Sequence, residues 1–171
     1  MAESTTESTA ENGFRGPQVC KVVGISYRQL DYWARTGLVT PSVQPAQGSG
    51  SQRLYSFEDL VDLKLINKLL QAGVSLQRVR EAISYLHSLG QNLKGITIAS
   101  DGVSVYACKS AEEVYDVLRR GQGVFGIAID PVMKELEGSV SQLKLKAEPQ
   151  TAPVGAPVAP EKLGGKTEVG E

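Results

Sequence analysis

The sequence runs Val22-Val23-Gly24-Ile25-Ser26-Tyr27-Arg28-Gln29-Leu30-Asp31-Tyr32-Trp33-Ala34-Arg35-Thr36-Gly37-Leu38-Val39-Thr40-Pro41 and, after a Gly-rich interval, Gln52-Arg53-Leu54-Tyr55. Gly24 can adopt the left-handed conformation that ends a helix, and Ser26 can accept hydrogen bonds from the first amides of the next helix. Gly37 is a second helix stop. We therefore predict two helices joined by a tight turn, the second one covering Tyr27–Thr36.

This second helix has an apolar face and a polar face. Leu30, Trp33 and Ala34 follow the i, i+3, i+4 spacing of a buried stripe. The outward face carries Arg28, Gln29, Tyr32 and Arg35. A helix that enters the DNA major groove needs such an apolar back and a hydrogen-bonding front. An ordinary solvated face, or an interaction module with the same geometry, shows the same spacing, so spacing leaves these alternatives open.

The segment from Pro17 to Leu86 resembles the DNA-binding domain of the MerR family of transcriptional regulators. The matching motifs occur in the family's order: Trp33-Ala34-Arg35-Thr36-Gly37-Leu38-Val39, Pro41, Arg53-Leu54-Tyr55-Ser56, Glu58-Asp59-Leu60 and Gly73-Val74-Ser75-Leu76. They span about 70 of 171 residues and are far more specific than a single short motif. Residues 30–38 are closest to actinobacterial members. The resemblance implies a winged helix-turn-helix of four helices and a β-wing.

Two positions depart from the family pattern, which often has arginine at position 31 and glutamate at position 34. This chain has Asp31 and Ala34 there. Because a carboxylate repels phosphate, Asp31 either reads a cytosine amino group or turns toward Arg28 or Arg35. The usual arginine contact is therefore not carried over to position 31.

The stretch between Pro41 and Gln52 is rich in Gly, Ser, Gln and Pro and predicts a two-stranded wing. We expect Leu38–Val39 to pair with Arg53–Tyr55. In the resembling family an arginine and a tyrosine at these positions contact phosphate, which assigns that role to Arg53 and Tyr55. Packing of the Tyr55 ring on the next helix is an equal alternative.

Seven residues form the predicted DNA-binding set: Ser26, Arg28, Gln29, Tyr32, Arg35, Arg53 and Tyr55. Arg35, Arg53 and Tyr55 are assigned to the phosphate backbone. Arg28, Gln29 and Tyr32 are assigned to base edges.

Two further helices complete the predicted N-terminal domain. Ser56 caps a helix that extends to Ala72 and is apolar on much of its circumference, so we predict that it forms the core. Gly73 ends it, and Ser75 caps a fourth helix whose inner stripe is Leu76, Val79, Ile83 and Leu86.

Beyond Gly95 the apolar period changes to two. Alternating apolar residues on both sides of Asp101-Gly102 predict a β-hairpin. A helix capped by Ser110, with Ala111, Val114, Val117 and Leu118 inward, a buried strand over Val124–Ile129, and a helix opened by Pro131 follow. The stripe Met133, Leu136, Val140 and Leu143 indicates packing on that sheet, with a dimer contact as the alternative.

The predicted fold class is α+β. The chain is predicted to begin with a disordered tail (1–13), followed by the winged helix-turn-helix domain (14–90). A small strand-strand-helix-strand-helix domain (91–146), for effector binding or dimerisation, comes next, and a disordered tail (147–171) follows it. From Phe14 to Gly90 nine Lys/Arg stand against five Asp/Glu, whereas the remainder has nine against fourteen. A basic part beside an acidic part suits a DNA-reading domain joined to another module.

Catalytic, metal and cofactor sites have little support in the sequence. Cys20 and Cys108 are far apart, and His87 is the single histidine. The motif Gly121-Gln122-Gly123-Val124-Phe125-Gly126 follows a predicted helix and enters a strand, which is the wrong context for a dinucleotide site. We therefore expect no enzyme, no cofactor and no metal.

The sequence thus predicts a sequence-specific transcriptional regulator that binds double-stranded promoter DNA. The resemblance adds a homodimer and a contact with RNA polymerase as expectations. No apolar run approaches membrane-spanning length, so a cytoplasmic, nucleoid-associated protein without a membrane partner is expected. The effector is left open. The alternative is a protein–protein interaction module that keeps the helix-turn-helix fold without binding DNA.

Overall fold

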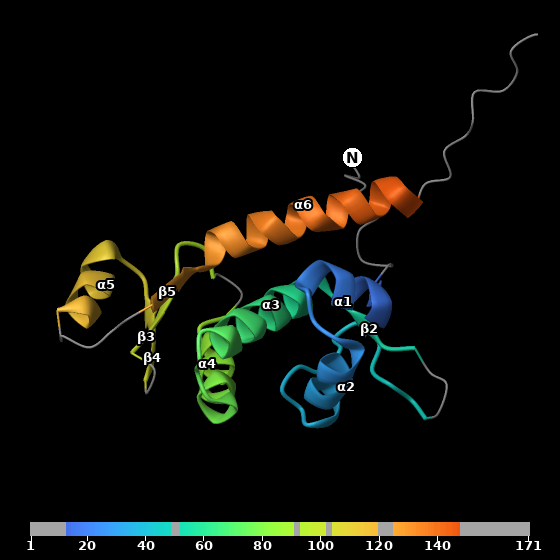
Figure 1. The fold of residues 1–171 in the computed structure, drawn as a ribbon, viewed down its shortest axis with the longest axis horizontal. Helices are drawn as coiled ribbons and strands as arrows, with labels where there is room; N and C mark the ends of the chain where they lie inside the picture. Colours follow the sequence, from blue (N-terminus) through green and yellow to red (C-terminus); the bar gives the residue numbers. More distant parts are fainter. Residues whose placement is uncertain (1–12, 49–51, 91–92, 102–103, 120–124, 148–171) are drawn as a thin grey trace, which may run out of the picture.

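The computed structural model of the chain describes residues 13–48, 52–90, 93–101, 104–119 and 125–147. Its elements are β1 (Phe14–Arg15), α1 (Gly16–Val23), α2 (Tyr27–Arg35), β2 (Leu54–Tyr55), α3 (Phe57–Gln71), α4 (Leu76–Ser88), β3 (Thr97–Ser100), β4 (Val105–Cys108), α5 (Ala111–Leu118), β5 (Phe125–Ala128) and α6 (Ile129–Ala147). Figure 1 shows α1–α4 clustered at one end, β3–β5 with α5 at the other, and α6 lying over the first group. The predicted α+β class is confirmed.

The N-terminal helices begin at the predicted caps. The hydroxyl oxygens of Ser26, Ser56 and Ser75 accept from the backbone N–H three residues on, at 3.2, 3.1 and 3.4 Å. Gly24 has φ 82° at the end of α1, where the left-handed conformation favours glycine. These local signals are strong because each cap satisfies backbone groups that the helix itself leaves unpaired.

The core of the N-terminal part is built around α3. Five of its side chains are completely buried: Leu60, Leu63, Leu65, Ile66 and Leu69. They join one continuous apolar cluster that also includes residues of α1, α2, α4 and α6. A helix buried on so many sides explains why its sequence is apolar around most of its circumference.

The predicted strand pairing of the wing is wrong. β2 pairs with β1, joining Arg15 to Leu54, and a single bridge joins Gln44 to Leu54. Leu38 and Val39 are buried instead, and their amides donate to the Trp33 carbonyl at 2.9 and 3.4 Å. Gly37 turns the chain back over the end of α2, so these two residues close the helix and are not available to a sheet.

The C-terminal region contains the predicted hairpin in a three-stranded antiparallel sheet of order β4-β3-β5. The predicted Asp101-Gly102 turn lies partly outside the described residues. β5 is an edge strand with alternating half-buried and exposed residues, so the predicted buried strand is wrong. In α5 only Val114 and Val117 are half-buried, whereas Ala111 and Leu118 are exposed. The expected inner stripe is therefore narrower, because α5 covers only part of the small sheet.

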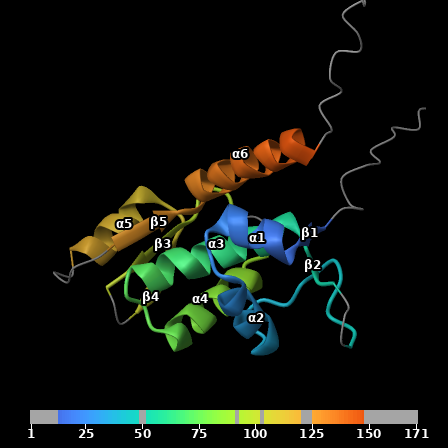
Figure 2. The same cartoon turned by 45° about the vertical axis from the view of Figure 1, so that its right-hand side comes forward.

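The position of α6 differs from the expectation. Its buried residues Ile129, Val132, Leu136 and Val140 pack chiefly against α1 and α3, not against the sheet that precedes it. Lys64 Nζ of α3 lies 2.9 Å from Glu135 Oε1 of α6. Figures 1 and 2 agree that α6 and α2 lie on opposite sides of α1 and α3. α6 thus ties the C-terminal region to the N-terminal core.

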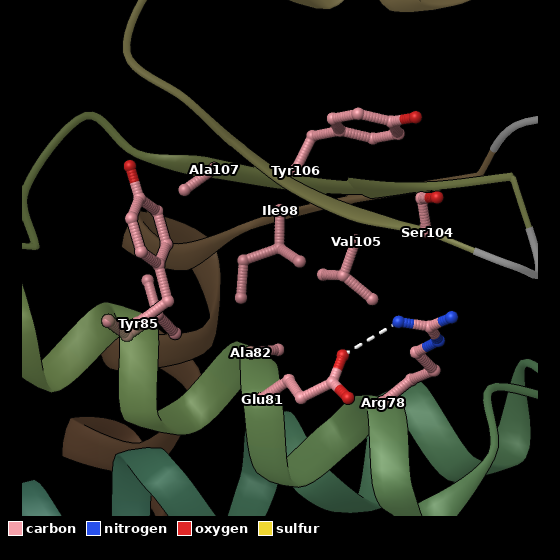
Figure 3. A pocket seen from close by; sticks show the side chains of 10 residues that line it. Arg78, Glu81, Ala82, Tyr85, Ile98, Ser104, Val105, Tyr106 and Ala107 are labelled. Atoms are coloured by element: carbon pink, nitrogen blue, oxygen red, sulfur yellow. Dashed lines mark hydrogen bonds and ion pairs between the residues drawn. The ribbon is translucent and has the colours of Figure 1, made fainter.

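A cavity of about 300 Å³ separates α4 from the hairpin. Figure 3 shows Ile98, Val105 and Ala107 directed toward α4, with the Arg78–Glu81 ion pair (2.8 Å) at one end of the cavity. Ala82 of α4 and Ala107 of β4 are among the residues that line this cavity. None of the helices in the described part of the chain is both long and apolar enough to cross a membrane.

The buried stripe of α6 makes a direct stability test. Leu136 is 0% exposed, so Leu136→Ala should lower the free energy of unfolding by about 2–5 kcal/mol, because the lost methyl groups leave a cavity. Leu118→Ala on α5 is the control, since Leu118 is 47% exposed and its truncation should cost under about 1 kcal/mol. Urea unfolding measures both. Equal effects of the two substitutions would contradict the packing of α6.

Candidate nucleic-acid interface

The two faces of α2 are arranged as its sequence predicts. Leu30 and Trp33 are only 2% and 3% exposed and belong to the apolar cluster. On the other side Arg28 is exposed, Tyr32 is 47% exposed and the Arg35 side chain is 67% exposed. The helix is thus fastened by its apolar face and presents a guanidinium-rich face to solvent.

Ser26 and Gln29 form a reciprocal cap at the start of α2. The Ser26 hydroxyl oxygen accepts from the Gln29 N–H, and the Gln29 Oε1 accepts from the Ser26 N–H at 2.9 Å. This capping box orients the first turn of α2. The structure therefore gives both residues a structural partner, and their predicted contacts with DNA stay a prediction.

Asp31 connects α2 to the residue that precedes β2. Its Oδ2 lies 2.9 Å from Arg35 Nε, and its Oδ1 accepts from Arg53 Nη1 at 2.8 Å. The hydrogen bond from Arg53, and then the positive charge of Arg35, hold the pKa of Asp31 below its usual value. Asp31 thus turns toward Arg35, which is one of the partners predicted for it. Its second partner, Arg53, was not predicted, because it is distant in sequence.

Tyr55 packs in the core. Tyr55 is only 1% exposed, in agreement with the alternative prediction that its ring packs against the protein. Among the described residues no hydrogen bond of good geometry reaches its hydroxyl, although the Arg53 guanidinium lies near it. Burial raises the pKa of Tyr55 to about 12, and the nearby Arg53 guanidinium opposes that rise. A buried hydroxyl without a partner is uncommon, because its lost hydration is not replaced.

A surface hollow of about 390 Å³ lies between the start of α1, α2 and the strand β2. Arg15, Tyr27, Asp31, Arg53 and Tyr55 contribute to its lining. Two guanidinium groups and the exposed Tyr27 phenol make this hollow suited to an anionic group, and Asp31 opposes them with one negative charge. The hollow adjoins α2, which contributes Tyr27, Leu30 and Asp31 to its lining.

Three residues that the sequence analysis did not select hold this surface in place. Arg80 of α4 donates to the Thr36 carbonyl at the end of α2 (3.1 Å), and Lys64 of α3 donates to the Val23 carbonyl at the end of α1 (3.3 Å). Asp59 Oδ2 accepts from the Ser42 and Ser56 N–H groups at 2.8 and 2.9 Å. Basic side chains at helix ends satisfy unpaired carbonyl groups. Apart from the bond to Ser56, these contacts join residues that are far apart in sequence, so no local sequence pattern predicts them.

His87 and Asp62 form the remaining polar contact of note, which joins α4 to α3. His87 Nε2 lies 2.7 Å from Asp62 Oδ2. Burial raises the pKa of Asp62, and its bond to His87 opposes that rise. Within the described ranges, no group of three or more His, Cys, Asp or Glu side chains could hold a metal ion.

The buried hydroxyl of Tyr55 has a measurable consequence. Tyr55→Phe should raise the free energy of unfolding by about 1 kcal/mol at neutral pH, because it removes a hydroxyl that has lost its hydration. The pKa of the Tyr55 phenol is about 12 in the folded state, whereas its ordinary value is 10.0. The unfolded chain therefore loses this proton first, and the free energy of unfolding of the wild type falls as the pH rises from about 10 toward 12.

Urea unfolding across this pH range should show the alkaline loss in the wild type and a smaller one in Tyr55→Phe. Tyr85→Phe is the matched control, since the Tyr85 side chain is exposed and its hydroxyl is already hydrated. A loss of stability in Tyr55→Phe at neutral pH would show that the hydroxyl does have a partner.

Comparison with known proteins agrees with this geometry. Residues 14–86 match the MerR HTH family regulatory proteins. Over 130 residues the chain is 56% identical to proteins named HTH-type transcriptional regulators in Mycobacterium bovis and in two strains of Mycobacterium tuberculosis. The alignment covers 75% of this chain and 58% of each relative, so the chain spans less than two thirds of the curated relatives it matches. The chain thus contains, in residues 14–86, a helix-turn-helix domain of the MerR family of regulatory proteins.

Proposed function

We propose that this protein is a sequence-specific DNA-binding regulator of transcription whose helix α2 enters the major groove. The observation that carries the proposal is the orientation of α2. Leu30 and Trp33 anchor the helix, while Arg28, Tyr32 and Arg35 face solvent. Because α6 lies on the opposite side of α1 and α3, it leaves this face uncovered (Figure 2).

The proposal divides the polar groups between the two kinds of DNA contact. Arg28 and Tyr32 are assigned to base edges, where a guanidinium group can bind guanine through two hydrogen bonds. Arg35 and Arg53 are assigned to phosphates, with the hollow beside β2 receiving the backbone. Gln29 and Ser26 contribute by orienting the first turn of α2.

We further propose that the protein acts as a homodimer on promoter DNA. One recognition helix contacts only a few base pairs, and a two-fold dimer places two such helices on half-sites one or more helical turns apart. A regulator of this kind works in the compartment that holds the chromosome. The names of the mycobacterial relatives support a regulatory role.

Selection of bound sequences from random duplex DNA by the full chain tests this function. Enrichment of two copies of one short motif at fixed spacing is the expected result. The affinity for the selected duplex should fall steeply with rising salt, with a slope of about −0.9 for each phosphate neutralised. Failure to enrich any motif, together with binding that is insensitive to salt, would instead favour a protein–protein interaction module.

Arg28 provides the sharpest single-residue test of groove binding. Arg28→Ala should weaken binding to the selected duplex by about 1–3 kcal/mol and relax the base preference at one position, because a bidentate guanine contact is lost. Arg78→Ala is the matched control, since Arg78 is also an exposed arginine on a helix but pairs with Glu81 on α4. Competition binding against single-base variants of the duplex measures both. An unchanged preference in Arg28→Ala would remove Arg28 from the base-reading set.

A further inference from the structure

Asp31 places a negative charge between two guanidinium groups on the surface assigned to DNA. Its two carboxylate oxygens are divided between Arg35 of α2, at 2.9 Å, and Arg53 of the wing strand, at 2.8 Å. We use "wing" for residues 42–48 and 52–55. Arg53 is only 20% exposed at its side chain, while Arg35 is 67% exposed. The carboxylate therefore links the recognition helix to Arg53, which lies 22 positions away in sequence and directly before β2.

This arrangement has two opposed physical effects on DNA binding. Asp31 reduces the net charge of the three side chains from +2 to +1, and an approaching phosphate must compete with it for both guanidinium groups. It also holds the two guanidinium groups in one geometry before DNA arrives, which lowers the cost of ordering them on binding. The pairs are partly exposed and contribute little to stability, so a phosphate can replace Asp31 as a partner.

The two effects do not fall equally on all DNA sequences. Binding to an arbitrary sequence is supplied almost entirely by phosphate contacts, and it tolerates many side-chain positions. The affinity for an arbitrary sequence is therefore lowered by the positive charge that Asp31 neutralises, and it gains little from a fixed position of the guanidinium groups. A duplex whose base edges fit α2 binds in one register. In that complex the guanidinium groups are already ordered, so part of the affinity lost through the charge of Asp31 is regained.

We propose that Asp31 is a positioning residue that sets sequence selectivity, by restraining Arg35 and Arg53 from indiscriminate contact with the DNA backbone. This inference rests on the proposed function and adds to it the control of binding to non-target DNA. The ligand concerned is the phosphodiester backbone of duplex DNA.

Asp31→Asn tests the inference because it keeps the size of the side chain and removes its charge. The full-length variant and the wild type are titrated with the selected duplex and with a mixed-sequence duplex of equal length, at several salt concentrations. The variant should bind the mixed-sequence duplex several-fold more tightly at low salt. Its salt slope should steepen by about 0.9, because removing one negative charge raises the net charge of the three side chains by one. Affinity for the selected duplex should rise less, so the selectivity ratio falls.

Three further variants sharpen the result. Glu81→Gln removes one carboxylate from the Arg78 ion pair on α4 and should leave the selectivity ratio unchanged. Asp31→Glu keeps the charge and should retain a salt slope close to that of the wild type. Adding Arg53→Gln to Asp31→Asn removes one released guanidinium group, so the slope should return by about 0.9. A merely structural role of Asp31 would not produce this return.

Other outcomes overturn the inference. Equal loss of affinity for both duplexes, with a lower melting temperature, would make Asp31 a structural residue. Loss for the selected duplex alone, with an unchanged salt slope, would mean that Asp31 contacts a base. Failure of the wild type to bind either duplex at low salt would overturn the proposed function itself, and the inference with it.

Discussion

The burial of Leu30 and Trp33 is the constraint on which the solvent-facing surface of α2 depends. α2 is a helix of nine residues, too short to be stable by its own hydrogen bonds. Its apolar face joins the core, and the Trp33 carbonyl accepts the amides of Leu38 and Val39 where the chain turns back. Once the indole is fixed, helical geometry directs Arg28, Tyr32 and Arg35 outward.

Long-range polar contacts then fix how this helix sits relative to its neighbours. Arg80 and Lys64 satisfy carbonyl groups at the ends of α2 and α1, and Asp59 joins Ser42 of the wing to the start of α3. Asp31 joins α2 to Arg53. Each contact satisfies a polar group that would otherwise face water or lie unpaired, so the surface is held by a small set of charges around an apolar core.

The placement of α6 links the two ends of the chain. Its apolar stripe continues the cluster formed by α1 and α3, and Glu135 lies between Lys64 and Lys68 at 2.9 and 3.6 Å. α6 therefore contacts the same α3 that forms the centre of the N-terminal core. The hairpin contacts α4 beside the cavity of Figure 3.

Local sequence is sufficient to predict where α2, α3 and α4 begin and which side of α2 is buried. These features depend on groups a few residues apart: a serine hydroxyl and the amide three positions on, or a stripe repeated every turn. Tertiary structure alone decided the partner of β2, the direction of α6, the burial of Tyr55 and the pairing of Asp31 with Arg53. An apolar stripe predicts that a helix face will be buried, but it does not identify the element that covers it. An ion pair between residues 22 positions apart has no local sequence pattern, because only packing of the whole core brings its two charges together.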